Sequence, residues 1–119
     1  DYLGLSATTI SVTNAARIAA RVRELVPGVV TIVGGPHASA VPERTLEAFD
    51  AFDYAIAGEG EHSLFDLLGR LEEGAPVDDV AGLARRTERG IRANPRAPYI
   101  DDLDELPMPA WDLLPDFPY

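Results

Sequence analysis

The sequence predicts an α/β protein built on a parallel sheet. Within residues 1–75, three short apolar runs alternate with three segments of helical periodicity. Strands that alternate with helices in this way form parallel sheets with right-handed crossovers. Each apolar run is followed by a turn of glycines or small polar residues, at the end of a strand where open α/β sheets bind their ligands.

The first strand and helix occupy residues 2–26. Tyr2 to Ala7 is a short apolar run, typical of a strand covered on both faces. From Asn14 to Val26 the apolar residues recur at steps of three and four, as on one face of an amphipathic helix; they are Ala15, Ile18, Ala19, Val22 and Leu25. Thr13 or Asn14 is the expected N-cap.

The second strand and helix follow a proline–glycine stop at residues 27–28. Val29 to Val33 is a β-branched run too short for a helix, which indicates a buried strand. Pro42 suits the first turn of a helix because its missing N–H has no partner there in any case. We therefore expect a helix from Glu43 to about Phe49.

The third strand and helix complete the core. Asp53 to Ala57 is the predicted strand, and the helix runs from Glu61 to Glu73. Gly74 is the expected end of that helix. Its apolar stripe is Leu64, Phe65, Leu67, Leu68 and Leu71.

Two extensions follow the core, which we assign to residues 1–75. Residues 76–100 are predicted to form a β-hairpin, in which "GLARR" and "GIRAN" flank the turn "TERG". Residues 101–119 carry an acidic run and four prolines, so neither a helix nor a central strand is expected there. We interpret this segment as an extended arm or linker.

Composition removes several classes of function. The formal net charge is −10 and no block of arginines is present, so binding to a nucleic-acid backbone is disfavoured. The chain has no cysteine, which excludes disulfides, thiolate catalysis and an iron–sulfur cluster held by its own side chains. No apolar run approaches the roughly 20 residues of a membrane span. We expect a soluble, cytoplasmic protein without membrane or nucleic-acid partners.

The three turns after the predicted strands together describe a crevice for a large, partly polar ligand. They are "SATT" at 6–9, "GGPH" at 34–37 and "GEGE" at 58–61. Glycine lets a backbone approach a ligand closely because no Cβ intervenes, and hydroxyl groups add hydrogen-bonding capacity. The candidate cofactor-binding residues are Ser6, Ala7, Thr8, Thr9, Gly34, Gly35, Pro36, His37, Gly58, Glu59 and Gly60.

Simpler interpretations of these turns remain open. Glycine after a strand is often only a tight turn, and "GEGE" is not the G-x-G-x-x-G pattern of a dinucleotide site. The carboxylate of Glu61 suits the N-terminus of the following helix better than catalysis. The two histidines, His37 and His62, lack metal-ligand spacing, and His37 is the better candidate for ligand contact. We assign no catalytic residue and no metal ligand to this chain.

In combination, these motifs resemble a known family. "GLSATT", "VVTIVGGPHASAVPE", "DYAIAGEGEHSLFDLLGRLEEG" and "DLDELPMPAWDLLP" are similar to the cobalamin-binding domain that precedes the barrel of cobalamin-dependent radical S-adenosylmethionine enzymes. The resemblance covers nearly the whole chain. It implies a partial flavodoxin-like, that is Rossmann-like, three-layer sheet, of which our three strands would be the third, fourth and fifth.

The resemblance also implies a cofactor and its place. In this family two loops cradle the nucleotide tail of cobalamin. By resemblance, Ser6 and Thr8 match the first loop, and Gly34 and Gly35 match the second. The D-x-H-x-x-G element that supplies a lower axial histidine in some relatives is absent from this chain. The iron–sulfur cluster and S-adenosylmethionine would be bound elsewhere in a longer parent, an enzyme of methyltransferase or cyclase type, and the chain alone would not be catalytic.

The resemblance leads to one further expectation and leaves one alternative function open. A first strand that has lost its neighbours would lie at an uncovered edge and pair with another chain or with the arm. The alternative function is a cofactor-free, flavodoxin-like interaction domain that covers its neighbour, because a fold does not determine a function. A bulkier residue at Gly35 would separate the two hypotheses. A cobalamin-binding domain would lose its cofactor with folding largely intact, whereas a cofactor-free domain would show no functional effect.

Overall fold

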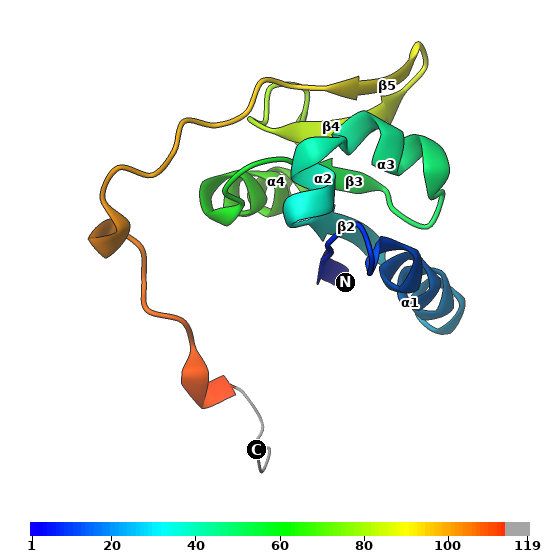
Figure 1. Ribbon diagram of the computed structural model, residues 1–119, viewed down its shortest axis with the longest axis horizontal. Helices are drawn as coiled ribbons and strands as arrows, with labels where there is room; N and C mark the ends of the chain where they lie inside the picture. The colour runs from blue at the N-terminus through cyan, green and yellow to red at the C-terminus, as the bar shows by residue number, and fades with distance from the viewer. Residues whose placement is uncertain (114–119) are drawn as a thin grey trace.

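The chain forms one five-stranded sheet with helices on both faces (Figure 1). The computed structural model describes residues 1–113. The strands are β1 (Tyr2–Ser6), β2 (Val30–Gly34), β3 (Tyr54–Ile56), β4 (Leu83–Thr87) and β5 (Gly90–Ala93). The α-helices are α1 (Val12–Leu25), α2 (Pro36–Ala40), α3 (Pro42–Ala48) and α4 (Glu61–Glu73), and two 3-10 turns, Leu103–Glu105 and Trp111–Leu113, lie in the arm.

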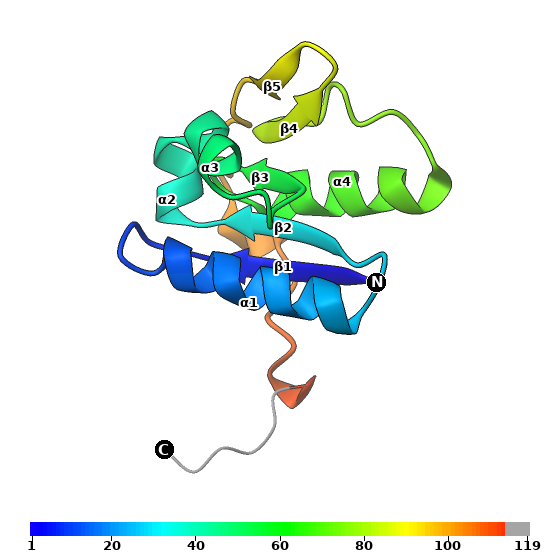
Figure 2. The same cartoon turned by 90° about the vertical axis from the view of Figure 1, so that its right-hand side faces the viewer.

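The sheet has a parallel half and an antiparallel half. Its order is β1-β2-β3-β4-β5. β1 pairs in parallel with β2, with Ser6 opposite Gly34, and β2 pairs in parallel with β3, so the carboxyl ends of these three strands share one edge (Figure 2). The predicted α/β class and the hairpin of β4 and β5 are confirmed. Sequence reasoning treated the hairpin as an extension, whereas β4 pairs antiparallel with β3 and continues the same sheet.

The helices differ from the predictions by more than one residue at two places. α1 begins at Val12 with Ser11 as its N-cap, so the expectation of Thr13 or Asn14 was wrong; Ser11 Oγ accepts a hydrogen bond from the Thr8 amide at 2.9 Å. Residues 36–40 form α2, where only a loop was expected, because Pro36 starts a helical turn immediately after Gly35. The end of α4 at Gly74, with φ 67°, is confirmed.

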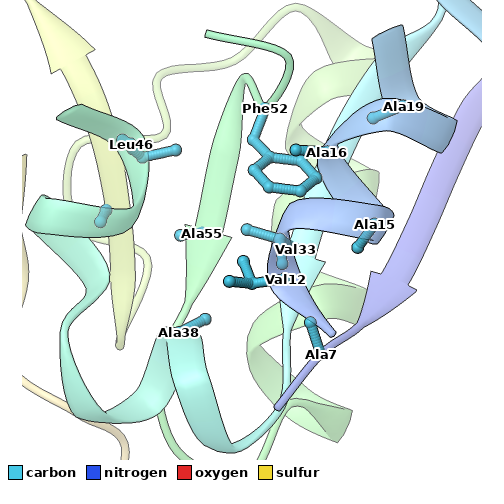
Figure 3. Packing of buried hydrophobic residues seen from close by; sticks show 11 residues of the cluster. Ala7, Val12, Ala15, Ala16, Ala19, Val33, Ala38, Leu46, Phe52 and Ala55 are labelled. Carbon is cyan, nitrogen blue, oxygen red and sulfur yellow. The ribbon is translucent and has the colours of Figure 1, made fainter. Parts of the chain in front are cut away.

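The larger core lies between the sheet and helices α1, α2 and α3. Phe52 is completely buried and points between α1 and the sheet, towards Ala16 and Val33 (Figure 3). α1 contributes mainly small side chains: Val12, Ala15, Ala16 and Ala19. α1 therefore meets the sheet through these residues, whereas Ile18 and Leu25 of the predicted stripe are 43% and 64% exposed.

The smaller core lies on the opposite face, under α4. Leu67 is fully buried against Ile32 and Ile56 of the sheet. Phe65 was predicted in the apolar stripe but is 83% exposed, since successive residues of a helix point about 100° apart and only one face meets the sheet. Arg70 near the end of α4 bonds to Asp66 and Asp79, and its hydrogen bond lowers the pKa of the Asp79 carboxyl.

A polar network joins β2 to the start of β3 at the amino ends of the strands. The Asp53 carboxylate accepts hydrogen bonds from the amide of Thr31 at 2.8 Å and from its hydroxyl at 2.9 Å. It also pairs with the guanidinium of Arg23 at 2.9 Å. Because Thr31 is completely buried, this carboxylate satisfies a donor that water cannot reach.

Replacing Asp53 by alanine is expected to destabilise the protein by about 2 kcal/mol, because the buried Thr31 amide loses its acceptor. Urea unfolding followed by circular dichroism measures this change. Asp53→Asn is the matched variant, since its amide oxygen can still accept one bond. Equal unfolding midpoints for Asp53→Ala and the wild type would contradict the role assigned to the carboxylate.

β1 is one edge strand of the sheet, and the arm follows β5, the edge strand on the other side. In the described part of the chain β1 pairs only with β2 and forms an edge of the sheet, as expected. The arm does not pair with β1 within residues 1–113 but leads away from the body (Figure 1), and residues 114–119 of the predicted arm lie outside the described range. Among residues 1–113, no helix has the length and hydropathy needed to cross a membrane.

Candidate cofactor-binding site

The three predicted turns meet at one edge of the sheet. The Ala7 amide donates to the Gly34 carbonyl at 3.0 Å, and the His37 amide donates to the Ala7 carbonyl at 3.0 Å. The Gly58 amide donates to Ser39 Oγ, in α2, also at 3.0 Å. These bonds connect the first turn to the second, and the third turn to α2, which continues from the second, so the three turns lie along the expected common rim.

Gly35 is required by the way in which the first two turns pack. Its φ of 87° and ψ of −173° lie in a region of backbone conformation that is almost exclusive to glycine. A Cβ built there would lie 2.5 Å from Ser6 Oγ and 2.9 Å from the Ala7 nitrogen. The expectation that a bulkier residue at Gly35 would leave folding largely intact therefore conflicts with the geometry.

A cavity of about 360 Å³ opens beside this rim. It lies on the α4 face of the sheet, because Ile32, Ile56 and Leu64 belong to the core beneath that helix. Its lining is mainly apolar and carries five of the predicted cofactor-binding residues: Ser6, Gly34, Gly35, Gly58 and Gly60. Side chains of the core do not fill it, so the cavity has the volume and the lining to take a small, largely apolar group.

Five other predicted residues lie in the rim but do not line the cavity. Ala7 is buried, with its side chain in the larger core and its backbone bonded to Gly34 and His37, and Thr8 is engaged with Ser11 at the start of α1. The Thr9 hydroxyl lies 3.1 Å from Nδ1 of His37, so these two side chains meet across the first two turns. Pro36 is the first residue of α2.

The remaining candidate, Glu59, directs its side chain towards the arm. Its Oε2 accepts a hydrogen bond from the Ile100 amide at 2.7 Å, while its neighbours Gly58 and Gly60 line the cavity. His62 is exposed on α4. Among residues 1–113, no group of three or more His, Cys, Asp or Glu side chains is arranged to hold a metal ion.

Sequence reasoning missed half of the cavity. Gly4, Leu5, Ile32, Ile56 and Leu64 line it, but none of them belongs to a turn. One signal was available: Gly4 is a glycine in the interior of a strand, which often marks the close approach of a ligand or another backbone. A Cβ on Gly4 would meet no atom within 4 Å, which is consistent with that signal.

Comparison with known proteins identifies the family. The B12 binding domain model matches residues 1–68, a range that includes every residue lining the cavity. An uncharacterized methyltransferase of Pyrococcus horikoshii is 32% identical over 115 residues, which are 97% of this chain and 25% of that protein. An anaerobic magnesium-protoporphyrin IX monomethyl ester cyclase of Rubrivivax gelatinosus is 30% identical over 96% of this chain and 21% of its own length.

A solved structure agrees with this match. The radical S-adenosylmethionine methyltransferase TsrM of Kitasatospora setae, with cobalamin and a [4Fe-4S] cluster bound, superposes with a TM-score of 0.68 at 26% identity and covers 86% of this chain and 19% of TsrM. The chain belongs to the B12 binding domain family. It spans a quarter or less of the relatives it matches, and these matches favour cobalamin binding over a cofactor-free domain.

Proposed function

We propose that this chain is the cobalamin-binding module of a radical S-adenosylmethionine enzyme. The observation that carries the proposal is the cavity at the carboxyl ends of β1, β2 and β3, lined by glycines and apolar side chains. Ligands of open α/β sheets bind at this edge, and the residues that line the cavity fall inside the B12 binding domain match.

The residues present fit a cofactor with a flat, partly polar tail. Gly34, Gly58 and Gly60 would let the backbone approach it closely, Gly35 would keep the first two turns packed together, and the Ser6 hydroxyl would supply a hydrogen bond. Leu5, Ile32, Ile56 and Leu64 form the apolar floor. Ala7, Thr8, Thr9, Pro36 and His37 would hold the rim in shape. Bound cobalamin supplies methyl-transfer or related radical chemistry, whereas the protein supplies binding, orientation and exclusion of water.

The rest of the parent is part of the same proposal. Relatives of four to five times this length are a methyltransferase and a cyclase, so we infer that the arm leads to a radical S-adenosylmethionine domain that holds the iron–sulfur cluster. Residues 1–75 would be the cobalamin-binding core, 76–100 the hairpin and 101–119 the linker. The free edge of β1 would take a further strand, from the same longer chain or a second copy, and we place the protein in the cytoplasm.

Cobalamin retention by the longer protein tests the proposed function. After incubation with hydroxocobalamin and desalting, we expect about one corrin per chain, seen in the visible spectrum, because the cavity would enclose the tail of the cofactor. Circular dichroism before and after desalting checks that the protein is folded. A folded protein that retains no corrin would refute the proposal and favour the cofactor-free alternative.

A further inference from the structure

The segment that follows β5 is attached to the sheet before the arm leaves the body. The Asn94 amide donates to the Leu83 carbonyl at 2.9 Å, and the Gly82 amide donates to the Pro95 carbonyl at 2.7 Å. The Asn94 side chain adds a bond to the carbonyl of Val80 at 2.8 Å. Residues 94 and 95 are thus fixed against the start of β4, which places the next residues beside the third turn of the site.

Arg96 covers the third turn from outside. Its Cβ and Cδ lie 3.9 Å from the position that a Cβ on Gly58 would take, which is ordinary van der Waals contact. Its guanidinium donates to the Ser39 carbonyl, while Ser39 Oγ accepts the Gly58 amide at 3.0 Å. Arg96 and Ser39 therefore hold Gly58 on two sides.

Glu59 makes the second connection. It lies between Gly58 and Gly60, both of which line the cavity, and its Oε2 accepts the Ile100 amide at 2.7 Å. The carboxylate is a charged acceptor, and hydrogen bonds to charged groups are about twice as strong as neutral ones. The same turn thus lines the cavity through Gly58 and Gly60 and contacts the arm through the Glu59 carboxylate.

We propose that Glu59 and Arg96 are positioning residues that anchor residues 94–100 to the cavity wall at 58–60. This inference rests on the proposed function for its ligand, because cobalamin in the cavity would order the wall and through it the start of the arm. Coupling between two sites is reciprocal. An anchored arm therefore strengthens cofactor binding, and bound cofactor in turn strengthens the attachment of the arm.

The test uses the full-length protein with Glu59→Ala and Arg96→Ala. Hydrogen exchange measured by mass spectrometry reports on the segment that contains Ile100, and titration with hydroxocobalamin reports on affinity. We expect Glu59→Ala to raise the exchange rate of the Ile100 amide about tenfold, since a charged acceptor is lost, and to weaken cobalamin binding several-fold. In the wild type, cobalamin should slow exchange at both 58–60 and 94–100; in Glu59→Ala it should slow only the former.

Matched controls separate the anchor from general destabilisation. Glu72→Ala and Arg44→Ala remove an exposed glutamate and arginine outside these contacts, and they should change neither readout. Glu59→Gln keeps an acceptor oxygen and should restore most of the protection at Ile100. Should Glu59→Ala fail to fold, Arg96→Ala provides the test. It leaves residues 58–60 unchanged, and it should likewise raise exchange at residues 94–100 and weaken cobalamin binding.

The possible outcomes distinguish this inference from the proposed function. Unchanged exchange at residues 94–100 and unchanged affinity in both alanine variants would overturn the anchor, even where the wild type binds cobalamin. A wild-type protein that binds no cobalamin would refute the proposed function, whereas faster exchange at Ile100 in its Glu59→Ala variant would still establish the attachment of the arm.

Discussion

Replacing Gly4 by valine is expected to weaken cobalamin binding by the longer protein about a hundredfold while leaving the fold intact. Gly4 lies opposite Ile32 in the parallel pair, and both residues line the cavity. A Cβ on Gly4 meets no protein atom within 4 Å, and valine is favoured in strands. Overpacking a filled site costs up to about 3 kcal/mol, which corresponds to about a hundredfold weaker binding.

The matched control for this variant is Gly69→Val. Gly69 lies on α4, outside the cavity lining, and its Cβ would also meet no atom within 4 Å. Titration with hydroxocobalamin and urea unfolding should show weakened binding with retained stability for Gly4→Val, and wild-type binding for Gly69→Val. Normal affinity in Gly4→Val would mean that cobalamin, if it binds, does not use this cavity.

Gly35→Val is expected to destabilise the fold by about 3 kcal/mol or more. The backbone of Gly35, with φ 87°, lies in a region where a side chain costs about 1–3 kcal/mol. Contacts of 2.9 and 3.1 Å with the Ala7 backbone add an overpacking penalty, which is typically about 1–3 kcal/mol. Since these atoms are main chain, they cannot move aside without breaking the bonds between the first two turns.

The neighbouring Gly34 provides the control for Gly35. Its nearest contact to a built Cβ is the Ile56 carbonyl oxygen at 4.0 Å, so Gly34→Ala should unfold near the wild-type urea concentration. Equal midpoints for Gly35→Val and Gly34→Ala would show that the first two turns do not pack as described. Because Gly35→Val affects folding, Gly4→Val is the better variant for separating cofactor loss from loss of structure.

Local patterns were sufficient for the order of the strands and of helices α1, α3 and α4. The β-branched run before Gly34 predicted β2, and the apolar period from Leu64 to Leu71 with a terminal glycine predicted α4, because these signals depend only on near neighbours in the chain. The pattern was weaker where small residues dominate: α2 has only five residues, with Gly35 between it and β2 and Val41 between it and α3, which is too short for a helical period to appear in the sequence.

The part of the site formed by the glycine turns was predictable from the sequence. The part formed by strand residues on the face of the sheet was not. Parallel strands bring their carboxyl ends together, so the meeting of residues 6–9, 34–37 and 58–61 followed from strand order. Ile32 and Ile56 were assigned to strands. Whether their side chains are covered by a helix or line a cavity depends on where α4 packs on the sheet. The contact of Glu59 with Ile100 joins residues 41 positions apart, and no local pattern encodes it.

The amino-acid sequence by itself determined the alternating strands and helices, the glycine turns that follow them and the resemblance to a cobalamin-binding family, because periodicity and backbone freedom are properties of neighbouring residues. Only the tertiary structure decided that the hairpin joins the main sheet, that the cavity extends beneath the rim along β1, β2 and β3, and that Glu59 faces the arm. These features arise from contacts between distant segments, whose geometry is defined only once the helices have packed on the sheet.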